Sequence, residues 1–212
     1  MNATELGLPS EAHVFEGRYI EIMPQLIQAG LTPWNIADVM DHRNNSVGTS
    51  HQEQVWNTYV NSDVGIARNK EKIYVEPHSA RLRAVNTQTH LRNGGLALAT
   101  TDLPATVKTY NRKDLILDRL LQEKEARAHP LWLDFANGDQ QRLDRLVENT
   151  FRLGKDKYNC DTLMGIYVPK EDKPTLRAVM LHTLGYESQA NGESHLDDYD
   201  IFSSAHLVGV RA

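Results

Sequence analysis

The segment Thr175–Leu184, with the sequence TLRAVMLHTL, is the stretch from which the predicted fold follows. Successive side chains of a strand point to opposite faces, so Leu176 and Ala178 would share one face, with Val179 and Leu181 on the other. Because both faces are apolar, this segment is predicted to be a central strand that is covered on each side.

The segments beside this strand extend the sheet. Leu163–Val168 and His206–Val210 are mainly apolar and are predicted to be strands, and Pro169–Pro174 is predicted to be a turn. Before the last strand lies Gly185–Ser204, a polar, acidic segment without Lys or Arg. Connections beyond roughly 12 to 15 residues are usually functional or disordered, so this one is a candidate site as well as a possible surface loop.

A hairpin and two longer helices are predicted in the middle of the chain. Val64–Ala67 and Lys72–Val75 resemble the strands of a β-hairpin around a polar turn. Asp139–Tyr158 repeats apolar residues at i, i+3, i+4, i+7 and i+8, which is typical of a helix that faces the core. Asp114–Phe135 is also predicted to be helical, with a break or kink at Pro130.

Two shorter helices are predicted nearer the N-terminus. The first would cover Pro33–Arg43 with Thr32 as its N-cap, because proline at the first helical position loses no hydrogen bond. The second would cover His51–Asn61, where Ser50 and Glu53 have the spacing of a capping box.

The order of these elements predicts the α+β class, with helices packed on an antiparallel or mixed sheet and a C-terminal third made mainly of strands. A chain of 212 residues fits one domain, and residues 1–212 are predicted to form a single α+β domain. Its possible subdivision is a helical segment 1–62, a hairpin and basic segment 63–110, a helical segment 111–158 and a sheet segment 159–212.

Composition is typical of a soluble protein. The single cysteine, Cys160, excludes an intramolecular disulfide and a cysteine-based zinc cluster, which suits a reducing cytoplasm. No export signal is recognisable at the N-terminus, and no apolar run is long enough to cross a bilayer. We therefore expect a cytoplasmic location and no contact with a membrane.

The motifs of several large enzyme classes are missing from the sequence. It contains no phosphate-binding loop and no GxGxxG, HExxH, CxxC, GxSxG or EF-hand pattern. These absences disfavour ATP-driven, nicotinamide-dependent and zincin-type chemistry, and no cofactor is predicted. Whether the protein is an enzyme stays open at this point, because folding can gather acid–base residues from distant segments.

The first candidate site is a cluster of His and Asp residues near the C-terminus, which could form if Thr175–Leu184 pairs with His206–Val210. The catalytic candidates are His182, His195, Asp197, Asp198 and His206. The possible metal ligands are His182, His195, Asp197 and His206, because imidazole and carboxylate groups suit Zn, Mn or Fe(II). A divalent metal there would support a metal-dependent hydrolase. The simpler alternative is a solvated acidic loop beside structural histidines.

The second candidate site is the basic segment of residues 77–113. It carries six basic residues and one acid, whereas the whole chain has a net charge of −5. The residues predicted to contact nucleic acid or phosphate are Arg81, Arg83, Arg92, Arg112 and Lys113. The alternative is that these side chains pair with acids elsewhere in the chain.

The leading functional prediction is a soluble, non-catalytic binding or accessory protein that acts through surface contacts with a protein or nucleic-acid partner. A surface for a protein partner or for self-association is also expected, because aromatic residues are enriched at interfaces and Trp34, Trp56 and Trp132 lie on or beside predicted helices. Buried core positions are the alternative for these tryptophans. The metal-dependent hydrolase remains the second hypothesis.

Overall fold

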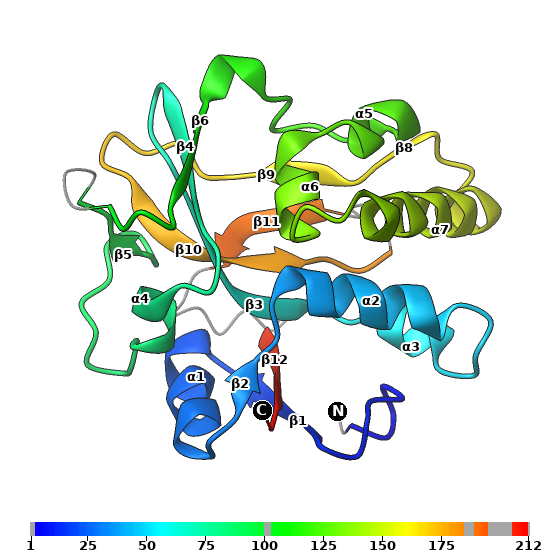
Figure 1. Cartoon of the computed structure of the whole chain (residues 1–212), viewed down its shortest axis with the longest axis horizontal. Coiled ribbons are helices and arrows are strands. Elements are labelled where there is room, and N and C mark those ends of the chain that lie inside the picture. Colours follow the sequence, from blue (N-terminus) through cyan, green and yellow to red (C-terminus); the bar gives the residue numbers. More distant parts are fainter. Residues whose placement is uncertain (1–2, 100–102, 185–188, 195–204, 212) are drawn as a thin grey trace.

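The chain folds into helices packed against a large mixed sheet, which confirms the predicted α+β class (Figure 1). The structure is a computed structural model that describes residues 3–99, 103–184, 189–194 and 205–211. Its helices are α1 (Tyr19–Gln28), α2 (Ile36–Ser46), α3 (Gln52–Trp56), α4 (Ala80–Arg83), the 3-10 helix η1 (Arg112–Asp114), α5 (Glu123–Arg127), α6 (Pro130–Phe135) and α7 (Gln140–Tyr158). Its strands are β1 (Ala12–Gly17), β2 (Thr32–Pro33), β3 (Val60–Arg68), β4 (Lys72–Glu76), β5 (Leu96–Ala97), β6 (Lys108–Asn111), β7 (Leu121–Gln122), β8 (Thr162–Leu163), β9 (Gly165–Tyr167), β10 (Thr175–Leu181), β11 (Gln189–Ser194) and β12 (Ala205–Val210).

Strand β10 lies in the interior of the main sheet, between β3 and β11. The path across the sheet is β1, β12, β3, β10, β11 and β9, and β10 runs antiparallel to both of its neighbours. The pairs β12–β3 and β11–β9 are parallel, so the sheet is mixed. Every residue of β10 is buried, which confirms the prediction of a central, covered strand.

The side chains of β10 enter two different cores. Val179 and Leu181 belong to the larger apolar cluster, together with residues of α2 and α7. Leu176 and Ala178 belong to a second cluster, together with residues of α1, which lies on the other side of β10 from α7 in Figure 1. The alternation of apolar side chains along the strand therefore fills the interior on both faces of the sheet.

Part of the predicted polar loop is a strand. Residues Gln189–Ser194 form β11, which pairs with β10 on one side and with β9 on the other. The prediction of a continuous loop is wrong for these residues, because pairing with two neighbouring strands outweighs their polar composition. The other residues of Gly185–Ser204 lie outside the described part of the chain.

The β3–β4 hairpin and helix α7 agree with the sequence prediction. β3 and β4 pair antiparallel, with Ile66 opposite Val75. Helix α7 is capped by Asp139, whose Oδ1 accepts a hydrogen bond from the backbone N–H of Arg142 (3.0 Å). The buried residues of this helix are Leu143, Leu146, Val147, Thr150, Phe151 and Gly154.

The segment Asp114–Phe135 is not one helix, because β7 pairs with β8 and this long-range pairing overrides local helix propensity. The break at Pro130 is confirmed: Pro130 is the first residue of α6, and His129 is the N-cap. Nδ1 of His129 accepts the backbone N–H of Leu131 (3.3 Å), and Nε2 donates to the carbonyl oxygen of Ile116 (2.9 Å). Burial also lowers the pKa of His129, which favours the neutral imidazole that this cap requires.

Helix α2 begins later than predicted. Asn35 is its N-cap, because the Asn35 side chain accepts from the backbone N–H of Asp38 (3.0 Å) and the Asp38 carboxylate accepts from the backbone N–H of Asn35 (2.9 Å). Thr32 is not the cap, since Thr32 and Pro33 form β2 and pair with β12. Proline is tolerated there because a short outer strand does not need every N–H.

Helix α3 ends earlier than predicted, at Trp56 instead of Asn61. The residue at its N-cap is His51, without a side-chain capping bond, so the capping box predicted at Ser50 is also wrong. Val60 and Asn61 instead belong to β3, where they pair with both β10 and β12. Pairing at the centre of the sheet decides the conformation of these residues.

The large apolar side chains are almost all inside the protein. Trp34, Trp56 and Trp132 are 8%, 2% and 1% exposed and belong to the larger core cluster, so they give no support to a tryptophan interface. Ile27 is the single large apolar residue that is exposed among those described. No helix in the described part of the chain combines the length and apolar character needed to span a membrane.

Candidate functional site

The two described histidines of the C-terminal cluster both contact Tyr59. The rings of His182 and Tyr59 meet edge-on, with 4.8 Å between their centroids. Nδ1 of His206 lies 3.2 Å from the backbone carbonyl oxygen of Tyr59. Strands β10 and β12 do not pair with each other, because β3 lies between them. The pairing assumed for this cluster is therefore wrong, although the fold still brings both histidines to the same tyrosine.

The described part of the cluster contains no metal site. No group of three or more His, Cys, Asp or Glu side chains is placed to hold a metal ion in residues 3–99, 103–184, 189–194 and 205–211. His206 is 6% exposed, and its Nε2 lies 3.8 Å from a carboxylate oxygen of Glu16. The other candidates of the cluster, His195, Asp197 and Asp198, lie outside the described residues.

We expect the protein to lose stability as the pH falls from about 6.5 to about 4, because burial, with a further contribution from the charge of Arg43, lowers the pKa of His182 from 6.5 to about 4. In that range the unfolded chain binds a proton at His182 that the folded protein does not bind. The loss from this group reaches about 3 kcal/mol at full effect and vanishes above pH 6.5. Urea unfolding at several pH values measures it, and His182→Gln should reduce the slope. An identical slope in the variant would contradict a lowered pKa at His182.

Three arginines of the basic segment make contacts within the protein. Nε of Arg81 lies 3.2 Å from Oε2 of Glu76, and Nε of Arg83 donates to Oδ2 of Asp63 (2.9 Å). Nη2 of Arg92 donates to two backbone carbonyl oxygens of the loop between β9 and β10, each at 2.9 Å. Arg81 and Arg83 therefore pair with acids, as the structural alternative for the segment predicted, whereas Arg92 is held by backbone carbonyl oxygens.

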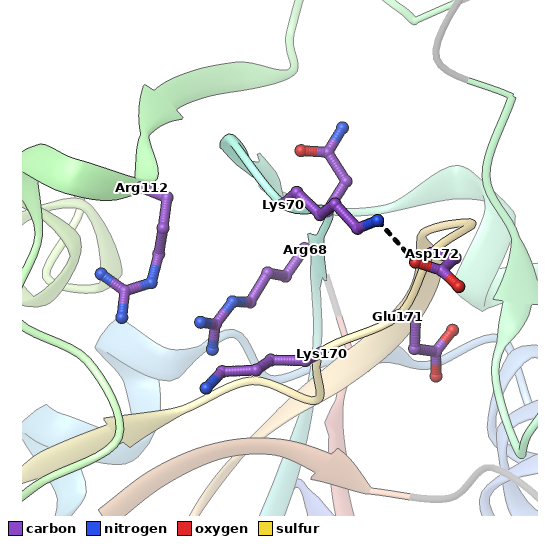
Figure 2. Close-up of a pocket in the computed structure, with 7 residues that line it drawn as sticks. Arg68, Lys70, Arg112, Lys170, Glu171 and Asp172 are labelled. Carbon is purple, nitrogen blue, oxygen red and sulfur yellow. Dashed lines mark ion pairs between the residues drawn. The ribbon is translucent and has the colours of Figure 1, made fainter.

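Arg112, unlike those three arginines, lines a surface pocket of about 480 Å³ (Figure 2). The pocket lies where the β3–β4 turn, the beginning of η1 and the β9–β10 loop come together. Its lining residues are Arg68, Asn69, Lys70, Arg112, Lys170, Glu171 and Asp172. Lys113, the neighbour of Arg112 in the sequence, is exposed but does not line the pocket.

Arg68 is the best-anchored cation of this pocket. It is the last residue of β3 and is only 5% exposed. A single nitrogen, Nη1, donates to Oδ2 and Oδ1 of Asp118 (2.8 and 3.0 Å) and to the carbonyl oxygen of Val168 (3.1 Å). No contact within the described part of the chain uses Nε or Nη2 of Arg68. The guanidinium is therefore held in place while two of its nitrogens keep donors for another group.

Arg112 and Lys170 are held more loosely. Nη2 of Arg112 lies 3.7 Å from Oδ2 of Asp118, and its Nη1 donates to the carbonyl oxygen of Leu115 at 3.4 Å. Its Nε is buried and has no hydrogen-bond partner among the described residues. The ammonium group of Lys170 has neither an ion pair nor a hydrogen bond within those residues. In Figure 2 the charged ends of Arg68, Arg112 and Lys170 lie on the same side of the pocket.

The two acids of the pocket lie on the other side and already have partners (Figure 2). Oε1 of Glu171 accepts from Nη2 of Arg177 (2.8 Å), and Oε2 accepts from the Thr175 hydroxyl (2.7 Å). Asp172 forms an ion pair with Lys70 at 3.2 Å, in which both side chains are more than four-fifths exposed. These acids therefore neutralise Arg177 and Lys70. The three converging cations are left with a single carboxylate, which is shared by Arg68 and Arg112.

That shared carboxylate belongs to Asp118. Its backbone has a φ of +63°, a left-handed conformation that Asp adopts more readily than most residues, and its N–H donates to the carbonyl oxygen of Ile166 (2.9 Å). Arg68, Arg112 and Lys170 carry three positive charges, and Asp118 carries one negative charge. The cationic side of the pocket therefore has a net charge of +2. Such an excess attracts an anionic group.

The sequence pointed to one residue of this cationic cluster, Arg112, which was predicted to contact nucleic acid or phosphate as part of the basic segment of residues 77–113. Arg68 and Lys170 were placed in turns, at Arg68–Glu71 and Pro169–Pro174, and neither turn was considered a site. Both turns contain basic residues, which is the signal that was available. What the sequence did not reveal is that the two turns meet each other and the start of η1 in space.

Comparison with known proteins identifies the fold. No protein-family model matches the chain, and no curated protein matches it. A solved structure, described as showing the accommodation of massive sequence variation in Nanoarchaeota by the C-type lectin fold, is similar over 94% of this chain and 97% of its own length. The TM-score is 0.68 and the sequence identity is 16%. The chain therefore has a C-type lectin-like α+β fold, and at this identity the likeness extends to the fold alone.

Proposed function

We propose that the protein is a non-catalytic binding protein whose cationic pocket holds an anionic group of its ligand or partner. The observation that carries this proposal is the convergence of Arg68, Arg112 and Lys170 on one pocket wall. The carboxylate of Asp118 pairs with the two arginines, and Lys170 has no ion pair among the described residues. The solved neighbour's fold is described as accommodating massive sequence variation, which is compatible with a scaffold whose surface residues determine what is bound.

The chemistry of the pocket supports binding over catalysis. Its seven described lining residues include no His, Cys, Ser or Thr, and its two acids, Glu171 and Asp172, are already paired with Arg177 and Lys70. They do include guanidinium and ammonium groups, which are suited to holding carboxylate and phosphate oxygens. With Ile27 as the single exposed large apolar residue among those described, charge is a stronger basis for recognition than an apolar patch.

The proposal predicts that Lys170→Met weakens binding of inorganic phosphate by about tenfold, because it removes a charged donor worth about 1.4 kcal/mol. Lys170 suits this test since it is exposed and makes no hydrogen bond or ion pair with other described residues, so its loss should leave folding intact. The measurement is isothermal titration calorimetry at pH 7.5 and low salt. Lys113→Met is the matched control: it removes the same charge from an exposed lysine of η1 that does not line the pocket.

The outcomes of this titration separate the pocket from general electrostatic attraction. Weaker binding in Lys170→Met with unchanged binding in Lys113→Met supports the pocket. Equal losses in the two variants would show that phosphate responds to net charge alone. Absence of phosphate binding in the unmodified protein would contradict the proposed function.

A further inference from the structure

We propose that the group held in the pocket is the dianionic phosphoryl group of a phosphomonoester. This inference rests on the proposed function and specifies the ligand class of the same site. A carboxylate and a phosphodiester are the competing anions, and each carries a single negative charge at neutral pH.

The charge of the pocket matches a dianion. Lys70 is neutralised by Asp172, and Glu171 is neutralised by Arg177, so neither pair contributes a net charge. The cations Arg68, Arg112 and Lys170 then face one carboxylate, that of Asp118, which leaves two positive charges. A phosphomonoester carries about −1.5 to −2 at pH 7, so it neutralises the excess that a carboxylate would only halve.

The arrangement of donors also favours a phosphoryl group. Nε and Nη2 of Arg68 and the ammonium of Lys170 have no partner among the described residues. Nη2 of Arg112, on a third segment of the chain, is engaged only in a long ion pair of 3.7 Å with Asp118. A phosphoryl group has three acceptor oxygens that point in different directions and can meet all three residues. A planar carboxylate is satisfied by one guanidinium in a bidentate pair, which would leave Lys170 and Arg112 without a role.

The acidic side of the pocket argues against a continuous nucleic-acid backbone. Glu171 and Asp172 lie across the pocket from the cationic ends of Arg68 and Lys170 (Figure 2). Because they are paired with Arg177 and Lys70, this side offers a second phosphate no unpaired cation. A terminal phosphoryl group places no further anion there. The volume of about 480 Å³ is also in the range of small-ligand sites, roughly 300 to 1,000 Å³.

Methyl phosphate and dimethyl phosphate test the inference, because they share a tetrahedral centre and differ by one negative charge. Titration calorimetry at pH 7.5 and low salt should give methyl phosphate an affinity at least about tenfold higher than that of dimethyl phosphate or acetate. Equal affinities for methyl and dimethyl phosphate would overturn the phosphomonoester inference and leave the proposed function standing. If none of the three anions binds, the proposed function fails as well.

Variants and pH provide two further checks. Lys170→Met and Arg112→Met should reduce the ratio of the two affinities, whereas Lys113→Met should leave it unchanged. Lowering the pH from 7.5 to 5 protonates methyl phosphate, whose second pKa is about 6, and should bring its affinity to that of dimethyl phosphate. Dimethyl phosphate keeps its charge over this range, so it corrects for any effect of pH on the protein. A ratio independent of pH would overturn the inference.

The phosphoryl group could come from a small organic phosphate or from a phosphorylated protein, and a second titration distinguishes the two. A sugar phosphate that binds more tightly than methyl phosphate supports the first source, and a phosphoserine peptide that does so supports the second. An oligonucleotide without terminal phosphates that binds more tightly than methyl phosphate would overturn the inference, because it offers only diesters.

Discussion

Replacing Arg43 by alanine is expected to lower the free energy of unfolding by about 3 kcal/mol or more, with each unsatisfied carbonyl costing about 1 to 3 kcal/mol. Arg43 is 5% exposed in α2, and its Nη2 donates to the carbonyl oxygens of Thr58 (3.1 Å), Leu181 (3.4 Å) and His182 (2.6 Å). The variant leaves these oxygens buried without that donor. Arg43 also lies 5.6 Å from the centre of the Trp56 ring, so packing is lost too.

The charge of Arg43 makes this position unusual. No Asp or Glu among the described residues forms an ion pair with it, and burial lowers its pKa to about 10. The guanidinium is therefore retained for its hydrogen bonds to three carbonyls near the ends of β10 and β3, in spite of the cost of burying a charge.

Urea unfolding at pH 7 measures the effect of Arg43→Ala, and Arg145→Ala is a suitable control. Arg145 is an exposed arginine of α7, and its removal is expected to change stability by at most about 0.5 kcal/mol. A loss below about 1 kcal/mol in Arg43→Ala would contradict the assigned role of the three carbonyl contacts.

Glu171→Ala is expected to destabilise the protein by about 3 to 5 kcal/mol, because it leaves a buried charge without its partner. The side chains of Glu171 and Arg177 are 10% and 3% exposed and lie 2.8 Å apart. Nε and Nη1 of Arg177 have no hydrogen-bond partner among the described residues, so the carboxylate is its main compensation. Loss of Glu171 also removes the acceptor of the Thr175 hydroxyl.

A double variant separates loss of the ion pair from loss of packing. Glu171→Leu combined with Arg177→Met removes both charges and keeps apolar volume, so it should be more stable than Glu171→Ala alone. Urea unfolding of the single and double variants gives this comparison. If the double variant is no more stable than the single one, the cost does not come from an uncompensated charge on Arg177.

The parts of the fold that could be predicted are those in which local pattern and tertiary context agree. The two apolar faces of Thr175–Leu181 already imply a covered strand, and the stripe of Asp139–Tyr158 already implies a helix against the core. The helix predicted at His51–Asn61 ends at Trp56, and Val60 and Asn61 belong to β3, where they pair with β10 and β12. These partners are distant in the sequence, so the local pattern does not predict the pairing. The same holds for Pro33, which pairs with Gly209 far along the chain.

The candidate site could be predicted only in part, for the same reason. Arg112 was singled out by the charge of its own segment, whereas Arg68 and Lys170 belong to two distant turns. The count of free and paired cations also depends on contacts such as Arg83 with Asp63, which remove residues of the basic segment from consideration. Composition reveals the excess of positive charge in residues 77–113, but only the fold shows which basic side chains remain unpaired and able to bind an anion.

The central claim, that Arg68 and Arg112 hold an anionic group together, is tested most directly by nuclear magnetic resonance of the arginine side chains. The Nε–H signals are followed at pH 7 while inorganic phosphate is added, after assignment with single Arg→Lys variants. We predict that the signals of Arg68 and Arg112 shift with one common saturation curve, while those of Arg81, Arg83 and Arg92 stay in place. Saturable shifts at those three arginines, with none at Arg68 and Arg112, would contradict the account.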